Sequence, residues 1–233
     1  MTFRGRNVVN EALLSLGAAA IAFVGTHFAL SHPLRAPLVR AVGAGPFLGL
    51  YSLVALATFA WMALAFRAAP PADLGGSGQI GWIFATVLTL PALVLFLGSL
   101  RKNPALPDPR AEAMASREAG GVFAVTRHPM MWGFALWAIS HITLWWSVRT
   151  LIVAGAVLFL ALVGAHMQDR KKRVLMGEAW SVWEARTTYW PRWTALPRAG
   201  WLLWLVALAL WLVITWSHIH AAGVPAGLWL WIG

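Results

Sequence analysis

The chain has no cysteine, so histidines and carboxylates are its main candidates for metal ligation. All carboxylates lie outside or at the edges of long apolar stretches, so we expect no carboxylate pair deep in a membrane. His27, His141 and His166 lie inside or at the ends of these stretches. Ionisable groups in such places are candidates for function. Two imidazoles on facing helices can hold haem iron without a thiolate.

The densest polar signal is the segment TRHPMMWGFALWAISH, from Thr126 to His141. Pro129 is suited to the first position of a helix, and the free N–H groups of that helix end attract anions. Arg127 adds a fixed positive charge beside it. A phosphate, a carboxylate or a haem propionate fits such a place. A lipid headgroup contact or a simple helix anchor is the alternative.

Gly133, Trp137 and His141 follow at four-residue spacing and therefore share one face of the predicted helix. Glycine on that face permits the close approach of a flat ligand or of another helix. A structural role stays open for His141, because a neighbouring hydroxyl such as that of Ser140 can satisfy an imidazole by hydrogen bonding.

The composition predicts an all-α integral membrane protein, since 60% of residues are apolar and only 11% are charged. Stretches of about 20 apolar residues recur and predict a bundle of about six transmembrane helices in one domain covering residues 1–233. The first stretch has no small-residue cleavage site after it, so we expect it to be a retained helix. The expected spans are Leu13–Leu30, Phe47–Phe66, Ile80–Leu100, Met130–Trp146, Leu151–Met167 and Trp201–Trp216.

The basic residues that give the net charge of +10 lie in loops beside the apolar spans. We therefore interpret them as a signal for membrane orientation and expect no nucleic-acid partner. Three loops hold 14 of the 18 Lys and Arg residues, which predicts that these loops are cytoplasmic and that both termini are not. In the loop after the fifth span, Trp180, Val182 and Trp183 share one side of a predicted helix. We expect that side to face the bilayer interface. The apolar tail from Val224 to Ile232 is too short to cross and should lie at the membrane surface.

Four stretches together resemble the NnrU family, bacterial membrane proteins named from denitrification gene clusters and homologous to 15-cis-zeta-carotene isomerase. They are HFALSHPLR, YSLVAL, RHPMMWGFALWAISH and DRKKRVLMGEAW. The resemblance implies a multi-pass protein of the bacterial inner membrane. For the isomerase branch it also implies haem b, with axial ligands at the positions of His27 and His141. Arg35 or Arg127 would then lie near the propionates, while His128, Gly133 and Trp137 would belong to the cofactor site.

The implied activity is cis–trans isomerisation of a polyene or action on another lipophilic small molecule within membrane lipid. One feature of the expected spans opposes the ligand pair. His27 lies a few residues from the cytoplasmic edge, whereas His141 lies about 12 residues, or roughly 18 Å of helix, inside it. Either the first helix begins nearer Val8, or His27 pairs with His128 or His166 instead.

Two other classes of function stay open. RHPMMWG also resembles the RHPxYxG motif of isoprenylcysteine carboxyl methyltransferases, with Met131 in place of the tyrosine and Asp169 at an acidic position. That resemblance implies S-adenosylmethionine bound at the cytoplasmic face through Arg127, His128 and Asp169. The third class is a non-enzymatic membrane factor that supports denitrification or the assembly of a redox complex.

Overall fold

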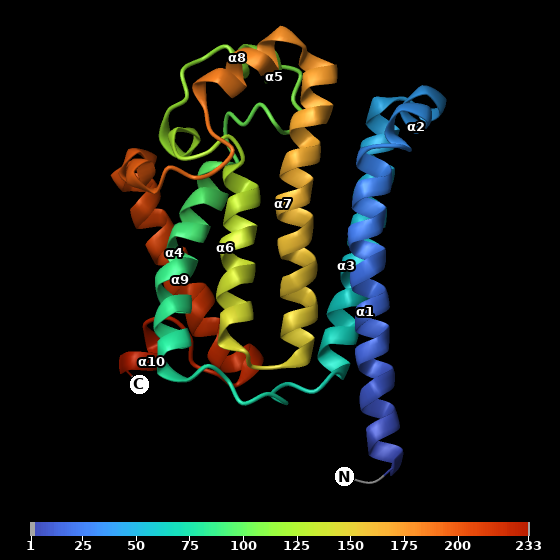
Figure 1. Ribbon diagram of the computed structural model, residues 1–233, viewed down its shortest axis with the longest axis vertical. Coiled ribbons are helices and arrows are strands. Elements are labelled where there is room, and N and C mark those ends of the chain that lie inside the picture. The colour runs from blue at the N-terminus through green and yellow to red at the C-terminus, as the bar shows by residue number, and fades with distance from the viewer. Residues whose placement is uncertain (1–2, 233) are drawn as a thin grey trace. The chain divides into compact units, whose positions relative to one another are not determined.

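The computed structural model describes residues 3–232, with side chains from residue 10 onward, and every regular element in this part of the chain is helical (Figure 1). The expected all-helical membrane class is therefore confirmed. Five helices are long and apolar enough to cross a membrane: Asn10–Ser31 within α1 (Phe3–Ser31), α3 (Ala44–Ala68), α4 (Gly78–Gly98), α7 (Val148–Met176) and α9 (Trp201–Ala222). The side on which the termini lie stays a prediction.

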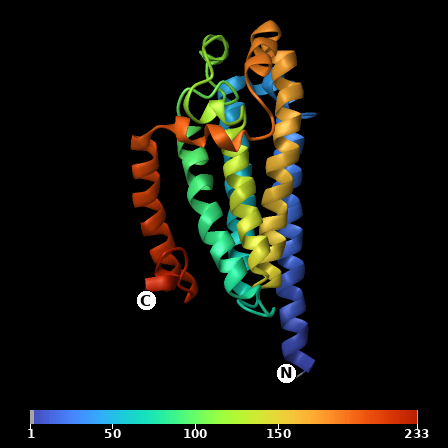
Figure 2. The same ribbon diagram turned by 60° about the vertical axis from the view of Figure 1, so that its left-hand side comes forward.

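The fourth expected span is a shorter helix than the other five. It is α6, which covers Pro129–Leu144 and has 16 residues. At 1.5 Å per residue it is about 24 Å long, less than the roughly 30 Å of a hydrocarbon core. Two views show α6 running beside α4, and these two helices are in extensive contact (Figures 1 and 2).

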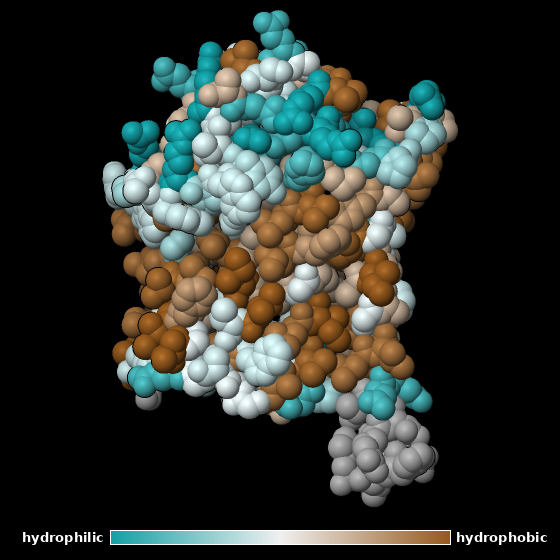
Figure 3. All heavy atoms as spheres, viewed as in Figure 1, coloured by the Kyte–Doolittle hydropathy of each residue, from teal (hydrophilic) through white to brown (hydrophobic). Residues whose placement is uncertain are grey.

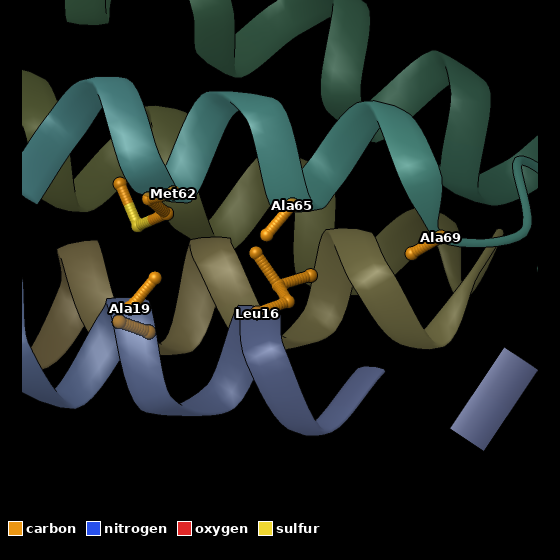
Figure 4. Close-up of a cluster of buried hydrophobic side chains, with 6 residues drawn as sticks. Leu16, Ala19, Met62, Ala65 and Ala69 are labelled. Atoms are coloured by element: carbon orange, nitrogen blue, oxygen red, sulfur yellow. The ribbon is translucent and has the colours of Figure 1, made fainter. Parts of the chain in front are cut away.

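Contacts divide the chain into two compact units. The first unit comprises Met1–Gly76 and Trp145–Leu160, with α1, α2 (Arg35–Val42), α3 and the beginning of α7. Its core is made by Leu16 and Ala19 of α1 facing Met62 and Ala65 of α3 (Figure 4). These side chains are small or flexible, so the two helix backbones can approach closely, as is usual in membranes.

One arginine closes the first unit at the end of α3. Arg149 Nη1 donates to the carbonyls of Phe66 and Ala69 at 3.1 and 2.9 Å, and its guanidinium lies 4.4 Å from the Phe66 ring centroid. The last carbonyls of a helix have no partner within it, and a cation there is favourable. Arg149 therefore caps α3 from the first turn of α7.

The second unit comprises Ser77–Leu144 and Ala161–Gly233. It contains α4, α6, α9 and the end of α7. Four short elements complete its polar end: α5 (Ala111–Ala115), the 3₁₀ helix η1 (Gly121–Ala124), α8 (Glu178–Arg186) and the 3₁₀ helix η2 (Trp193–Ala199). The tail ends in α10 (Trp229–Ile232), where the Trp229 indole N–H donates to the Leu212 carbonyl at 2.9 Å.

Large apolar side chains point outward along the helices. Ile80 is 83% exposed and Ile21 76% exposed, with many similar residues on every long helix. Figure 3 shows hydrophobic residues, in brown, over the middle of the helices, and hydrophilic residues, in teal, over the end where α5 and α8 lie. A water-soluble protein rarely exposes so much contiguous apolar surface, so the natural solvent of these faces is lipid.

Gly133 lies at the contact between α6 and α4. A β-carbon added there would lie 2.8 Å from the Ala92 carbonyl oxygen and 3.1 Å from the Phe96 backbone nitrogen. The absence of a side chain at Gly133 therefore serves the approach of another helix, which is one of the two alternatives that the sequence left open.

We predict that Gly133→Ala lowers the thermal stability of the purified protein, by about 1–3 kcal/mol, because the new methyl group meets backbone that cannot move aside. Gly155→Ala is the matched control, since Gly155 is also helical and has nothing within 4 Å of an added β-carbon. Thermal unfolding in detergent measures both. Equal stability of the two variants would show that α4 and α6 are not packed as described.

Candidate functional site

The segment Thr126–Pro129 joins η1 to α6 and is held by a second loop that follows α8. The Arg127 N–H donates to the Thr188 carbonyl at 2.9 Å, and the Thr126 hydroxyl lies 3.1 and 2.8 Å from the carbonyls of Thr188 and Tyr189. Pro129 is the first residue of α6, where its missing N–H costs nothing. The backbone of the motif is thereby fixed from both sides.

Asp169, near the end of α7, receives the charged side chains of this segment. Arg127 Nε lies 3.0 Å from Oδ1 and Nη2 lies 2.6 Å from Oδ2, a bidentate pair. His128 Nε2 lies 2.7 Å from Oδ1. The side chains of Asp169 and His128 are only 3% and 0% exposed. A buried carboxylate needs partners of this kind, and these two donors meet both of its oxygens.

The ion pairs continue outward to α8. Arg127 Nη2 lies 3.5 Å from Glu184 Oε1, and Glu184 also accepts two hydrogen bonds of 2.7 Å from Arg173. We call His128, Asp169, Arg127, Glu184 and Arg173 the charge cluster. It joins the start of α6, the last turns of α7, and α8, and basic and acidic side chains alternate along its length.

Aromatic rings surround the charge cluster. Trp180 and Trp183 of α8 are 0% and 2% exposed, and the Trp180 ring lies 6.4 Å from the His128 ring. The α8 helix was expected, but the prediction that Trp180, Val182 and Trp183 face the bilayer is wrong for the two tryptophans. Their rings face the interior of the second unit, where Trp183 packs edge-on against Phe123 at 5.6 Å. Val182 is half-buried.

Tyr189 closes the cluster on another side. Its hydroxyl donates to the Leu162 carbonyl at 2.7 Å, and its ring lies 5.6 Å from the Arg127 guanidinium. Burial raises the pKa of the Tyr189 phenol, and the negative charge of Asp169 raises it further. The phenol therefore stays protonated at neutral pH and keeps donating its hydrogen bond.

The contacts of the charge cluster are those of a group that stabilises the fold. Asp169 accepts from His128 Nε2, and His128 Nδ1 is buried without a hydrogen-bond partner among the described residues. The imidazole is out of reach of solvent, and the guanidinium of Arg127 is shared between two carboxylates of the chain. Asp169 thus gives Arg127 a carboxylate partner from within the chain, at the place where the sequence predicted an anion from outside it.

His141 lies in α6, well separated along the helix from the charge cluster. Its Nδ1 lies 2.8 Å from the Trp137 carbonyl and 3.1 Å from the Ser140 hydroxyl, and its ring contacts the Trp137 ring in a tilted arrangement, with the centroids 4.3 Å apart. A carbonyl only accepts, so Nδ1 carries the proton and Nε2 carries the lone pair. His141 therefore presents the nitrogen that a metal would bind.

His27 has the same local geometry in the first unit. Its Nδ1 lies 2.7 Å from the Phe23 carbonyl, which again leaves the lone pair on Nε2. Its ring lies 5.5 Å from Tyr51 of α3 in an edge-on contact, and the Tyr51 hydroxyl lies 3.4 Å from the Ser31 hydroxyl. His27 thus belongs to a small polar group within an apolar helix pair.

The remaining expected site residues are dispersed. Arg35 is the first residue of α2 and is half-buried, and His166 is exposed on α7. The described part of the chain contains no group of three or more His, Cys, Asp or Glu residues that could hold a metal ion. Haem iron needs only two axial nitrogen ligands from the protein, so a haem site does not require a group of three such residues.

Sequence reasoning linked Asp169 to Arg127 and His128 only through the methyltransferase resemblance, and it missed Glu184 and Tyr189. The available signal was the position of Asp169, a carboxylate at the edge of an apolar span. Such a group needs a cation close by. Nothing in the local pattern around Glu184 distinguishes it from a solvent-exposed carboxylate.

The helices and their outward apolar faces define a multi-pass integral membrane protein. A family model described as NnrU protein matches residues 15–226, so the chain belongs to the NnrU family. The comparisons with curated proteins and with solved structures give no match.

We predict that Asp169→Asn lowers stability by about 3–5 kcal/mol, because it leaves the buried His128 without its carboxylate partner and Arg127 with only the longer contact to Glu184. Glu178→Gln, an exposed carboxylate in the first turn of α8, is the control and should change stability by no more than about 0.5 kcal/mol. The measurement is thermal unfolding in detergent. If both variants unfold at the wild-type temperature, Asp169 does not lock the cluster.

Proposed function

We propose that this NnrU family protein binds haem b through His141 and His27 in a bacterial inner membrane and acts on a lipophilic polyene as a cis–trans isomerase. The observation that carries the proposal is the hydrogen bonding of His141. It is an imidazole inside a membrane helix whose Nδ1 proton is held by a backbone carbonyl, so that Nε2 is the ligating atom. Family membership supports the same reading.

The residues around His141 and His27 suit ligands of this kind. Hydrogen bonding of Nδ1–H to a backbone carbonyl fixes the ring orientation and increases the basicity of Nε2. The carbonyls of Trp137 and Phe23 do this for the two histidines. The apolar helix surfaces around them exclude water and admit a substrate from the lipid. Bound haem would supply a redox-active iron for the isomerisation.

The propionates of the proposed haem would need a cation, and Arg35 is the better of the two candidates. Arg127 already shares its charge between Asp169 and Glu184. The ion pairs among the described residues do not include Arg35. We therefore assign Arg35 to the propionates and Arg127 to the charge cluster.

We predict that protein purified from cells supplied with a haem precursor shows a Soret band, which is lost in His141→Ala and in His27→Ala. His220→Ala is the control. His220 also lies in the membrane helix α9, where its ring contacts the Trp216 ring at 4.6 Å. Absorption spectra of size-exclusion-purified variants give the readout.

A colourless wild-type protein that is fully folded would contradict the proposal. A Soret band that survives in both ligand variants would contradict the assignment of His27 and His141. Loss of the band in His220→Ala to the same extent would show that the spectrum reports general damage to the helices instead of ligation.

The charge cluster supports a second candidate, an S-adenosylmethionine-dependent membrane methyltransferase. The supporting observation is that Arg127, His128 and Asp169 meet in space, as the resemblance to isoprenylcysteine carboxyl methyltransferases requires. This candidate predicts binding of S-adenosylmethionine that is lost in Arg127→Gln and unaffected in His141→Ala. Titration calorimetry decides it, and absence of any binding heat to the folded wild type would contradict it.

A further inference from the structure

An apolar groove lies on the second unit between the last turn of α4 and the first turns of α9. It has a volume of about 460 Å³. Its walls include Leu97 of α4 and Leu202, Leu203 and Val206 of α9, and Arg101 lines it just beyond the end of α4. Both helices are candidate membrane spans, so the groove runs along surface that faces lipid.

The cations at this groove have no carboxylate partner in the described chain. Arg101 and Arg198 are both exposed, and Arg198 is adjacent to Ala199, which also lines the groove. The ion pairs found among the described residues use Arg110, Arg127 and Arg173 as their cations, and His128 contacts Asp169. The charge of Arg101 is therefore available to an anion from outside the chain.

We propose that this groove binds one anionic phospholipid, with an acyl chain along Leu97, Leu203 and Val206 and the phosphate at Arg101. The aromatic residue at the edge supports this placement. Trp201 begins α9 and is 74% exposed, and tryptophan is enriched at the level of lipid headgroups. An apolar wall that ends at a tryptophan and an unpaired arginine matches the amphiphilic form of a lipid.

An apolar wall alone would accept several occupants, and the positive charge of Arg101 distinguishes between them. A zwitterionic lipid offers the arginine a phosphate together with a competing ammonium group, whereas phosphatidylglycerol offers a net negative charge. A second copy of this chain would bring a surface rich in arginine and lysine, because the net charge is +10. The anionic lipid is thus the occupant with complementary chemistry.

The test uses the full chain in detergent, titrated with phosphatidylglycerol or with phosphatidylcholine of the same acyl chains, and native mass spectrometry to count retained lipid. We expect preferential retention of phosphatidylglycerol by the wild type. Arg101→Gln should weaken that binding by about fivefold, the effect of one cation near a headgroup. Arg117→Gln, an exposed arginine that does not line the groove, should leave it unchanged.

A groove-filling variant tests the acyl-chain part of the proposal. Val206 is 51% exposed and lines the groove, so Val206→Trp should reduce retention of phosphatidylglycerol. Glycerol 3-phosphate, which has the headgroup chemistry without the acyl chain, should not compete. Equal retention of both lipids, or competition by glycerol 3-phosphate, would overturn the proposal. So would a Val206→Trp variant that changes the oligomeric state and still retains phosphatidylglycerol as the wild type does.

Discussion

The buried carboxylate of Asp169 is the constraint on which the polar end of the second unit depends. A carboxylate that is 3% exposed is costly unless cations and hydrogen-bond donors surround it, and here Arg127 and His128 occupy both of its oxygens. Those two residues immediately precede α6, so satisfying one charge fixes where that helix begins. The same guanidinium reaches Glu184 and thereby orients α8.

The structure separates two roles that the motif RHPMMWGFALWAISH carries in one stretch of sequence. Two of its first residues, Arg127 and His128, pair with the buried carboxylate of Asp169. Its last residue, His141, has one nitrogen held by the Trp137 carbonyl and the other left with its lone pair. Between them Gly133 brings α6 against α4. Stability and the proposed ligand chemistry thus occupy opposite ends of one short helix.

Hydropathy was sufficient to predict the helices, because a span of apolar residues has only one way to satisfy its backbone in lipid. Hydropathy could not predict which apolar side chains face lipid and which face the protein interior. Trp180 and Trp183 fit a bilayer-facing side in sequence, but their rings pack beneath the charge cluster. The pairing of Arg127 with Asp169 joins residues far apart in sequence, so the local pattern around either could not reveal it.

Hydrogen–deuterium exchange of the wild type and of Asp169→Asn tests the locking role of this carboxylate most directly. We expect faster exchange in residues 121–132 and 187–193, whose backbone is bonded together around Arg127, and unchanged exchange in α1 and α3 of the first unit. Unchanged exchange in the two segments, or equal acceleration throughout α1 and α3, would contradict it.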